Sequence, residues 1–281
     1  MSASQHPAPS LSHARQRLRV LGRRPRKSLS QSFLDDPEVA AAIVHAARLG
    51  SQQDVLEVGP GLGVLTERLA GLARRVVAIE IDPVLADWLR SQVEGSNVNV
   101  VTSDVLQSEP ARYFQTPFVV VANLPYHVTS PALRHLLNAG PPFASRLVVM
   151  VQAEVADRIA ARAGELSALA VTIQVQTEVN VVLRVAASAF YPRPKVDSAV
   201  MLMEPISESD RIISRAELAA FTKLVQAGFK QPRKRLANSL AEGLGSPKQA
   251  AVDLLETAGI DPDLRPQVLT VGDWVRLYRC R

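Results

Sequence analysis

The chain has 281 residues, of which 47% are hydrophobic and 21% charged, so it is long enough to bury one large globular core and a smaller one. This composition excludes a fibrous or wholly disordered protein, and no apolar run approaches the ~20 residues needed to span a bilayer. A formal net charge of +5 favours a polyanionic partner, and the single cysteine, Cys280, excludes an internal disulfide framework or a cysteine-based metal site. We therefore expect a cytoplasmic protein without a membrane partner.

Residues 1–27 differ in composition from the rest of the chain. They contain seven Lys or Arg, no acidic residue and several Ser and Pro, so we expect a basic, disordered N-terminal arm. Three interpretations stay open: an arm that contacts RNA phosphates, an organelle transit peptide, or a solvated tail without a function.

Helical and strand patterns alternate from about residue 38 to residue 205. The first is the helical pattern PEVAAAIVHAARLG, for which Gly50 is the expected C-terminal cap. Short β-branched runs follow, separated by helical stretches, at residues 54–59, 75–82, 97–104, 117–124, 146–152 and 179–185. This alternation predicts a mostly parallel sheet with helices on both faces. Ligands of such sheets bind at the carboxyl ends of the strands, which is where Gly59, Glu80, Asp104 and Asn123 fall.

The strand patterns stop after about residue 206. Two of the helices that follow are predicted to open with capping boxes, one at Ser214 and Glu217 and the other at Thr270 and Asp273. Residues 206–281 are therefore expected to form a small helical C-terminal domain.

A glycine-rich turn follows the first strand pattern. In LEVGPGLGVL, Gly59, Gly61 and Gly63 stand between a strand and a helix, where the absence of side chains lets a ligand approach the backbone. Glu80 ends the next strand, a position from which an acid commonly accepts hydrogen bonds from a ribose diol. Asp104, after the third strand, is either a helix N-cap or an acceptor for the exocyclic amine of adenine. These features indicate an adenosine-containing ligand and leave NAD and S-adenosylmethionine open.

The segment NLPY, from Asn123 to Tyr126, favours the second of these cofactors. An exocyclic adenine amine is a poor nucleophile until acceptors bind its N–H groups, and the Asn123 amide oxygen and the Leu124 carbonyl supply two acceptors. Pro125 fixes the backbone, and Tyr126 offers a ring for stacking on the base. Because transfer from a cationic sulfonium depends mainly on positioning, we predict methyl transfer to an aromatic amine. An ordinary strand-to-helix turn would explain Pro125 alone.

Eight ordered blocks resemble the small-subunit (16S) rRNA adenine N6,N6-dimethyltransferases of the KsgA (RsmA) type: QSFL, LEVGPGLGVLT, IEID, SDVL, NLPYHVTSP, VQAEVADRIAA, FYPRPKVDSAV and RKRLANSL. The resemblance extends from about Lys27 to the C-terminus. It implies a Rossmann-like class I methyltransferase domain over residues 28–205, with a seven-stranded, mostly parallel sheet, and a helical RNA-binding domain over residues 206–281.

The same resemblance implies the ligands and the roles of the site residues. The cofactor is S-adenosylmethionine and the product S-adenosylhomocysteine. The substrate is 16S rRNA in the immature small ribosomal subunit, where two adjacent adenines near the 3′ end are each methylated twice. The enzyme is expected to be a monomer without a metal. The implied catalytic residues are Asn123, Leu124, Pro125 and Tyr126, and the implied cofactor-binding residues are Ser32, Leu34, Gly59, Gly61, Glu80, Ile81, Asp104, Val105 and Asn123, with Ile81 and Val105 beside the adenine.

Four positions depart from the family pattern. Where the family usually has Gly-Gln-Asn-Phe-Leu, this chain has Ser30 and Ser32, and the shorter Ser32 is expected to reach the cofactor only through its backbone or through water. Ala153 and Pro232 stand where a lysine and an arginine are usual, which affects individual RNA or cofactor contacts.

Two basic segments are candidates for RNA contact. In FYPRPK, an aromatic residue is expected to stack on or wall off a flipped adenine while the cations meet phosphates; the alternative is an aromatic pair that anchors a proline-rich loop. In KQPRKRL, the cations form either an RNA contact or an ordinary solvated face, and the basic chain favours RNA. The candidate RNA-binding residues are Phe190, Arg193, Lys195, Arg233, Lys234 and Arg235.

Two alternative functions stay open. One is a 23S rRNA adenine methyltransferase of the macrolide-resistance type, which shares an NLPY-type site but is disfavoured by the DSAV and RKRLANSL blocks. The other is a mitochondrial transcription or assembly factor that uses this fold without turnover, which the intact segment from Asn123 to Tyr126 disfavours.

Overall fold

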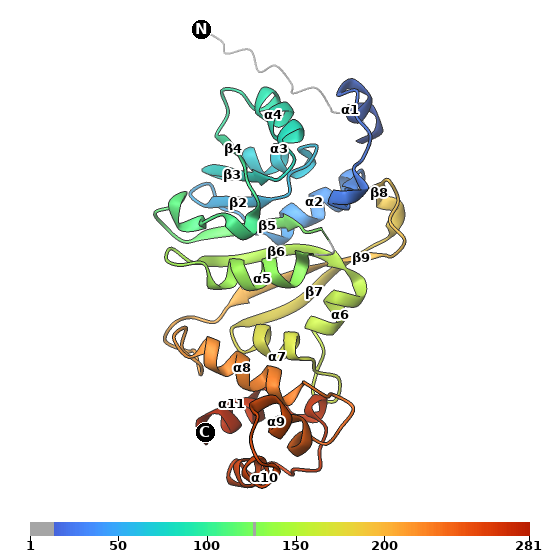
Figure 1. Ribbon diagram of the computed structural model, residues 1–281. Helices are drawn as coiled ribbons and strands as arrows, with labels where there is room; N and C mark the ends of the chain where they lie inside the picture. The colour runs from blue at the N-terminus through green and yellow to red at the C-terminus, as the bar shows by residue number, and fades with distance from the viewer. Residues whose placement is uncertain (1–13, 126–127) are drawn as a thin grey trace.

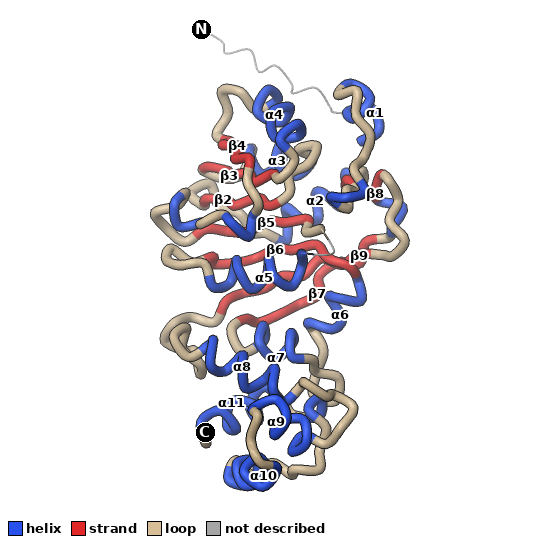
Figure 2. The backbone as a smooth tube through the Cα atoms, in the orientation of Figure 1, coloured by secondary structure: helices blue, strands red, loops and turns tan. Residues whose placement is uncertain are grey.

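A seven-stranded sheet lies at the centre of the molecule (Figures 1 and 2). The computed structural model describes residues 14–125 and 128–281. The sheet has the strand order β4-β3-β2-β5-β6-β9-β7, and β1 and β8 form a separate two-stranded ribbon. The strands are β1 (Phe33–Leu34), β2 (Asp54–Val58), β3 (Arg75–Glu80), β4 (Val98–Thr102), β5 (Phe118–Asn123), β6 (Ala144–Gln152), β7 (Thr177–Val185), β8 (Phe190–Tyr191) and β9 (Ser198–Pro205).

Parallel pairing dominates the central sheet. The strands from β2 to β6 pair in parallel, and β9 runs antiparallel between β6 and β7. The predicted Rossmann-like, mostly parallel sheet is therefore confirmed, and the six strand patterns correspond to β2 through β7. β9 had no counterpart among those patterns, because its AVMLM stretch contains mostly residues that are not β-branched.

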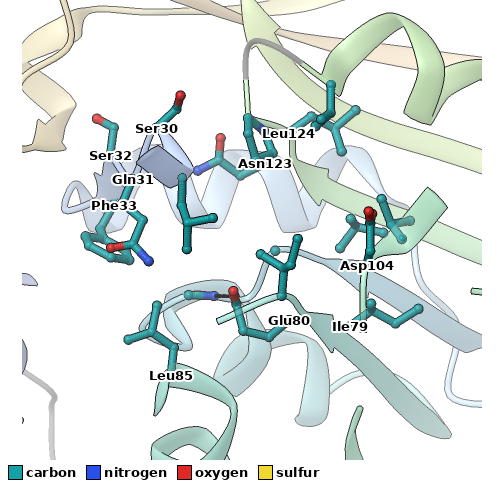
Figure 3. Close-up of a pocket in the computed structure, with 18 of the residues that line it drawn as sticks. Ser30, Gln31, Ser32, Phe33, Ile79, Glu80, Leu85, Asp104, Asn123 and Leu124 are labelled. Carbon is teal, nitrogen blue, oxygen red and sulfur yellow. Dashed lines mark hydrogen bonds between the residues drawn. The ribbon is translucent and has the colours of Figure 1, made fainter. Parts of the chain in front are cut away.

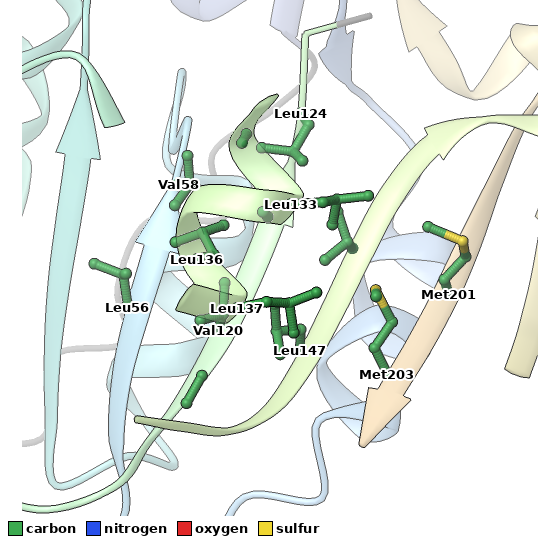
Figure 4. Close-up of a cluster of buried hydrophobic side chains, with 14 of the residues drawn as sticks. Leu56, Val58, Val120, Leu124, Leu133, Leu136, Leu137, Leu147, Met201 and Met203 are labelled. Carbon is green, nitrogen blue, oxygen red and sulfur yellow. The ribbon is translucent and has the colours of Figure 1, made fainter. Parts of the chain in front are cut away.

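Helices cover both faces of the sheet. On one face, Leu133 and Leu136 of α5 pack in one cluster with Leu56 of β2 (Figure 4). On the other face, α2 and α3 pack against a second cluster that contains Val55. Val55 and Leu56, which are neighbours in β2, thus pack into the cores on opposite faces of the sheet, because successive side chains of a strand point to opposite faces. The helices are α1 (Ala14–Val20), α2 (Pro37–Ala46), α3 (Val64–Ala70), α4 (Pro83–Gln92), α5 (Thr129–Asn138), α6 (Ala153–Ile159), α7 (Ala168–Gln174), α8 (Leu218–Gly228), α9 (Leu236–Leu244), α10 (Lys248–Thr257) and α11 (Val271–Arg279).

The helices α8 to α11 form a second unit around the buried side chain of Trp274, at the β7 side of the sheet (Figure 1). This confirms the expected helical C-terminal region. α7 joins the two units, because Ile173 belongs to the core of the sheet while Ala170 and Val171 belong to the helical core. The division at residues 205 and 206 stays a prediction. Within the part of the chain that the structure describes, no helix is long and apolar enough to cross a membrane.

The two expected capping pairs differ in detail. At α11 both reciprocal hydrogen bonds of the capping box between Thr270 and Asp273 are present. Before α8, the Glu217 carboxylate accepts hydrogen bonds from the Ser214 backbone N–H (3.0 Å) and hydroxyl (2.7 Å), and the helix begins only at Leu218.

Two expectations about the N-terminal part were wrong. Residues 14–20 of the expected disordered arm form α1, in which Ala14 and Leu18, one turn apart, are buried. Residues 1–13 lie outside the described residues. α2 ends at Ala46 instead of near Gly50, and the left-handed residue that follows it is Arg48, with a φ of 47°.

Candidate active site

One pocket lies at the carboxyl ends of β2, β3, β4 and β5 (Figure 3). Glu80 and Asp104 reach it from β3 and from the turn after β4, and Asn123 faces them from the end of β5. This is the edge at which parallel sheets bind ligands. The predicted residues that the pocket brings together are Ser32, Gly59, Gly61, Glu80, Ile81, Asp104, Val105, Asn123, Leu124, Pro125 and Phe190.

The glycine turn needs its glycines for two reasons. Gly59 and Gly61 have φ angles of +70° and +54°, which side chains disfavour. A Cβ atom on Gly59 would also lie 3.2 Å from the Asn123 carbonyl oxygen, and one on Gly61 would lie 3.1 Å from the Phe33 ring. The bare backbone of the turn therefore forms part of the pocket surface, where a ligand can approach it closely.

Glu80 is a buried, hydrogen-bonded carboxylate of the pocket. It is 5% exposed, and its carboxylate accepts hydrogen bonds from the backbone N–H groups of Gly61 (3.0 Å) and Asp82 (2.9 Å). Burial raises the pKa of Glu80, and these two hydrogen bonds oppose that shift. Because a carboxylate offers about four lone-pair directions, roughly two remain for donors of a ligand.

Asp104 combines the two roles that the sequence left open. Its Oδ1 accepts a hydrogen bond from the Leu106 backbone N–H (2.9 Å), so it caps the short 3-10 turn that follows, and it also lines the pocket. Its position beside the pocket leaves the second carboxylate oxygen as an acceptor for a ligand amine.

Asn123 ends β5, where it is paired in register with Met150 of β6. The next residue, Leu124, donates its backbone N–H to the Met150 carbonyl (3.2 Å), which fixes the start of the NLPY segment. Among residues 14–125 and 128–281, the Asn123 side-chain amide has no hydrogen-bond partner. An amide held at a fixed place with its oxygen unused can orient a ligand that carries an amine.

One predicted cofactor-binding residue, Leu34, does not line the pocket. Leu34 is 5% exposed and packs in the core with Phe190, its ribbon partner, so its side chain supports the pocket wall from behind. Tyr126 lies outside the described residues, as does His127. Ser32 does line the pocket, but its hydroxyl donates a hydrogen bond to the Pro192 carbonyl (2.7 Å). This bond connects the segment before β1 to the loop after β8.

Sequence reasoning missed nine lining residues. Most lie on the segment before β1 or on strand ends beside predicted residues, and Leu85 reaches the pocket from the first turn of α4. The pairing of β1 with β8 places the first group there; the QSFL block pointed to this segment, but only Ser32 and Leu34 of it were predicted as site residues. The missed residues are Leu29, Ser30, Gln31, Phe33, Val58, Ile79, Leu85, Ser103 and Val128.

The candidate RNA-contacting residues occupy two separate places. Phe190 is 6% exposed, so it forms pocket wall and offers no open stacking face, while Arg193 and Lys195 are exposed on the loop that follows. The segment 233–235 is exposed before α9, and Arg235 forms an ion pair with Asp263 (2.7 Å). RNA contact by these residues stays a prediction. Among the described residues, no group of three or more His, Cys, Asp or Glu could hold a metal ion.

Comparison with known proteins shows which family the chain resembles. The model of the family described as ribosomal RNA adenine dimethylase matches residues 22–280. The ribosomal RNA small subunit methyltransferase A of Dehalococcoides mccartyi is 40% identical over 282 aligned positions, which cover 96% of this chain and 93% of the relative. The protein of the same name from Bacillus mycoides is 39% identical and covers 90% of this chain and 89% of its own length.

Solved structures show the same architecture. The 23S rRNA methyltransferase ErmE has a TM-score of 0.69 at 31% identity, covering 88% of this chain and 98% of that one. A dimethyladenosine transferase from Plasmodium falciparum has a TM-score of 0.72 at 27% identity, covering 87% and 95%. By the extent of the family match and the identity of its relatives, the chain belongs to the ribosomal RNA adenine dimethylase family.

Proposed function

We propose that this chain transfers methyl groups from S-adenosylmethionine to the N6 atoms of two adjacent adenines near the 3′ end of 16S rRNA. The observation that carries the proposal is the convergence of Glu80, Asp104 and the segment from Asn123 to Pro125 on one pocket above the glycine turn. As a member of its family, the chain is an rRNA adenine dimethyltransferase.

The pocket residues fit the adenosine part of this cofactor. Glu80 has unused lone pairs for a ribose diol, and Asp104 has an unused oxygen for the adenine amine. Ile81 is 49% exposed at the rim although it is a large apolar side chain, whereas Val105 is 7% exposed. Two apolar side chains at the pocket, one of them uncovered, suit the faces of a flat base.

The substrate adenine is held by the residues at the end of β5. Once bound, S-adenosylmethionine supplies a methyl group on a cationic sulfur that is a good leaving group. The Asn123 amide oxygen and the Leu124 carbonyl accept hydrogen bonds from the target amine, which turns its lone pair towards the methyl group. Pro125 holds this backbone in place, so positioning supplies most of the rate increase. Stacking by Tyr126 stays part of the proposal from sequence alone.

The names of several curated relatives favour the small-subunit substrate. Relatives called ribosomal RNA small subunit methyltransferase A are 39–40% identical, whereas ErmE, a 23S rRNA methyltransferase, is 31% identical.

We propose the immature small subunit as partner, the monomer as active form and the cytoplasm as location. We also propose residues 206–281 as an RNA-binding domain that contributes the exposed cations before α9.

Methylation of separated ribosomal subunits tests this function. The purified chain is incubated with labelled S-adenosylmethionine and with small or large subunits that lack the modification, and the labelled nucleotides are mapped. We expect N6,N6-dimethyladenine at two adjacent positions near the 3′ end of 16S rRNA only. Label in 23S rRNA, or none in either subunit, would contradict the proposal, and an Asn123→Ala variant controls for contaminating activity.

A further inference from the structure

The N-terminal helix α1 supports the pocket from outside. Its buried apolar residues, Ala14 and Leu18, form one cluster with Phe33, Leu62 and Leu85. Phe33 and Leu85 line the pocket, and Leu62 lies within the glycine turn. Three separate wall elements therefore rest on one short helix, which lies beside β8 (Figure 1).

Arg17 is the polar centre of this contact. It is 5% exposed, and its guanidinium donates to the carbonyl oxygen of Leu62 and to the Glu67 carboxylate (3.1 and 3.4 Å). Leu62 precedes the last glycine of the turn, and Glu67 lies in the first part of α3. One side chain thus joins the turn to the helix that follows it, and a buried charge of this kind requires its partners to stay in place.

A neighbouring residue extends the contact to β8. The Arg15 guanidinium lies over the Tyr191 ring, 4.9 Å from its centroid. Tyr191 pairs with Phe33 in the ribbon of β1 and β8. α1 therefore holds the glycine turn and the ribbon together, although it precedes residue 22, where the match to the family model begins.

A glycine-rich turn is stabilised strongly by contacts that fix its conformation. Gly59, Gly61 and Gly63 all have positive φ angles, and glycine loses more conformational freedom on ordering than any other residue. If the turn were mobile before binding, ligand binding would have to order it. The free energy of binding would then be less favourable by the free energy needed for that ordering. Because contacts with α1 order the turn in the unbound protein, ligand binding does not have to supply this free energy.

We propose that α1, through Arg17, is a positioning element of the cofactor pocket, which holds the glycine turn in the conformation that binds S-adenosylmethionine and S-adenosylhomocysteine. The identity of the ligand rests on the proposed function, whereas the ordering of the turn does not. Arg17 touches the turn and α3 and does not line the pocket, so it acts through other residues.

The test compares two arginines of the same helix in the full chain. Arg17→Met removes the buried guanidinium, and Arg19→Met is the control, since Arg19 is exposed and has no carboxylate partner within residues 14–125 and 128–281. Calorimetry measures S-adenosylhomocysteine affinity, and hydrogen exchange without ligand follows the peptide 59–67. We expect Arg17→Met to weaken binding by about tenfold or more and to speed exchange in that peptide. At saturating cofactor its methylation rate should stay near that of the unmodified chain.

The outcomes separate this inference from the proposed function. Unchanged affinity and exchange in a folded Arg17→Met variant would overturn the inference while leaving the function intact. A chain that binds no S-adenosylhomocysteine even without substitution would overturn the proposed cofactor, and with it the cofactor part of the inference. If Arg17→Met does not fold, Glu67→Gln removes the ion pair from the α3 side and is expected to change both measurements in the same direction.

Discussion

The substitution Glu57→Gln is expected to change how the stability of this protein depends on pH. Glu57 lies in β2 and is 1% exposed, and neither carboxyl oxygen has a hydrogen-bond partner among the described residues. Burial raises the pKa of Glu57 to about 8, and repulsion from Glu80 and Glu67 adds to the shift. The polar groups of Thr66 lie close enough to oppose the shift in part, although neither forms a well-aligned hydrogen bond with the carboxyl. The folded chain therefore holds a proton on Glu57 at neutral pH, and glutamine has nearly the shape of that protonated form.

The size of the effect follows from the two pKa values. An unfolded glutamate titrates near 4.3, so between that pH and about 8 the folded state binds a proton that the unfolded state has released. Stability from this group is fully present below the unfolded pKa and is lost as pH rises, at about 1.4 kcal/mol per pH unit. From pH 5 to pH 8 the loss is roughly 3 kcal/mol, and Glu57→Gln lacks it.

Urea unfolding without ligand at pH 5, 6.5 and 8 measures this difference. The free energy of unfolding of Glu57→Gln should exceed that of the unmodified chain by an amount that grows with pH. The comparison cancels the titration of the groups that do not interact with Glu57, and Glu94→Gln, at an exposed position, is the matched control. Parallel stability curves for Glu57→Gln and the unmodified chain would show that Glu57 is ionised in the folded state and would refute the reasoning.

Three further predictions concern ligand and substrate. Glu80→Ala should weaken S-adenosylhomocysteine binding by roughly 1.5–3 kcal/mol in calorimetry of the folded variant, because charge-assisted hydrogen bonds to the ribose are lost. Asn123→Ala should lower single-turnover methylation at saturating cofactor by about 10²-fold while subunit binding persists; a near-normal rate would make NLPY a structural turn. The double substitution of Arg233 and Lys234 by alanine should reduce the salt slope of subunit binding by about 2, and Arg112→Ala, a cation already paired with a carboxylate, should leave it unchanged.

The sequence by itself determined the ligand edge of the sheet. Gly59, Glu80, Asp104 and Asn123 each stand at or directly after the end of a β-branched run, and these runs are the neighbouring parallel strands β2 to β5. Strand identity depends on local periodicity, and parallel pairing then brings the four carboxyl ends together whatever the packing details. The family motifs, which include the same four positions, imply that the ligand is S-adenosylmethionine.

Only the tertiary structure decided which other residues meet that edge. Leu85 enters the pocket from a helix with no motif. Two hydrogen bonds that support the pocket wall, from Ser32 to Pro192 across 160 residues and from Arg17 to Leu62 across 45, are likewise long-range contacts. The deep burial of the Glu57 carboxyl cannot be predicted from the sequence pattern of β2 either. Such contacts depend on which surfaces face each other after the sheet has formed, whereas local patterns report only the conformation of neighbouring residues.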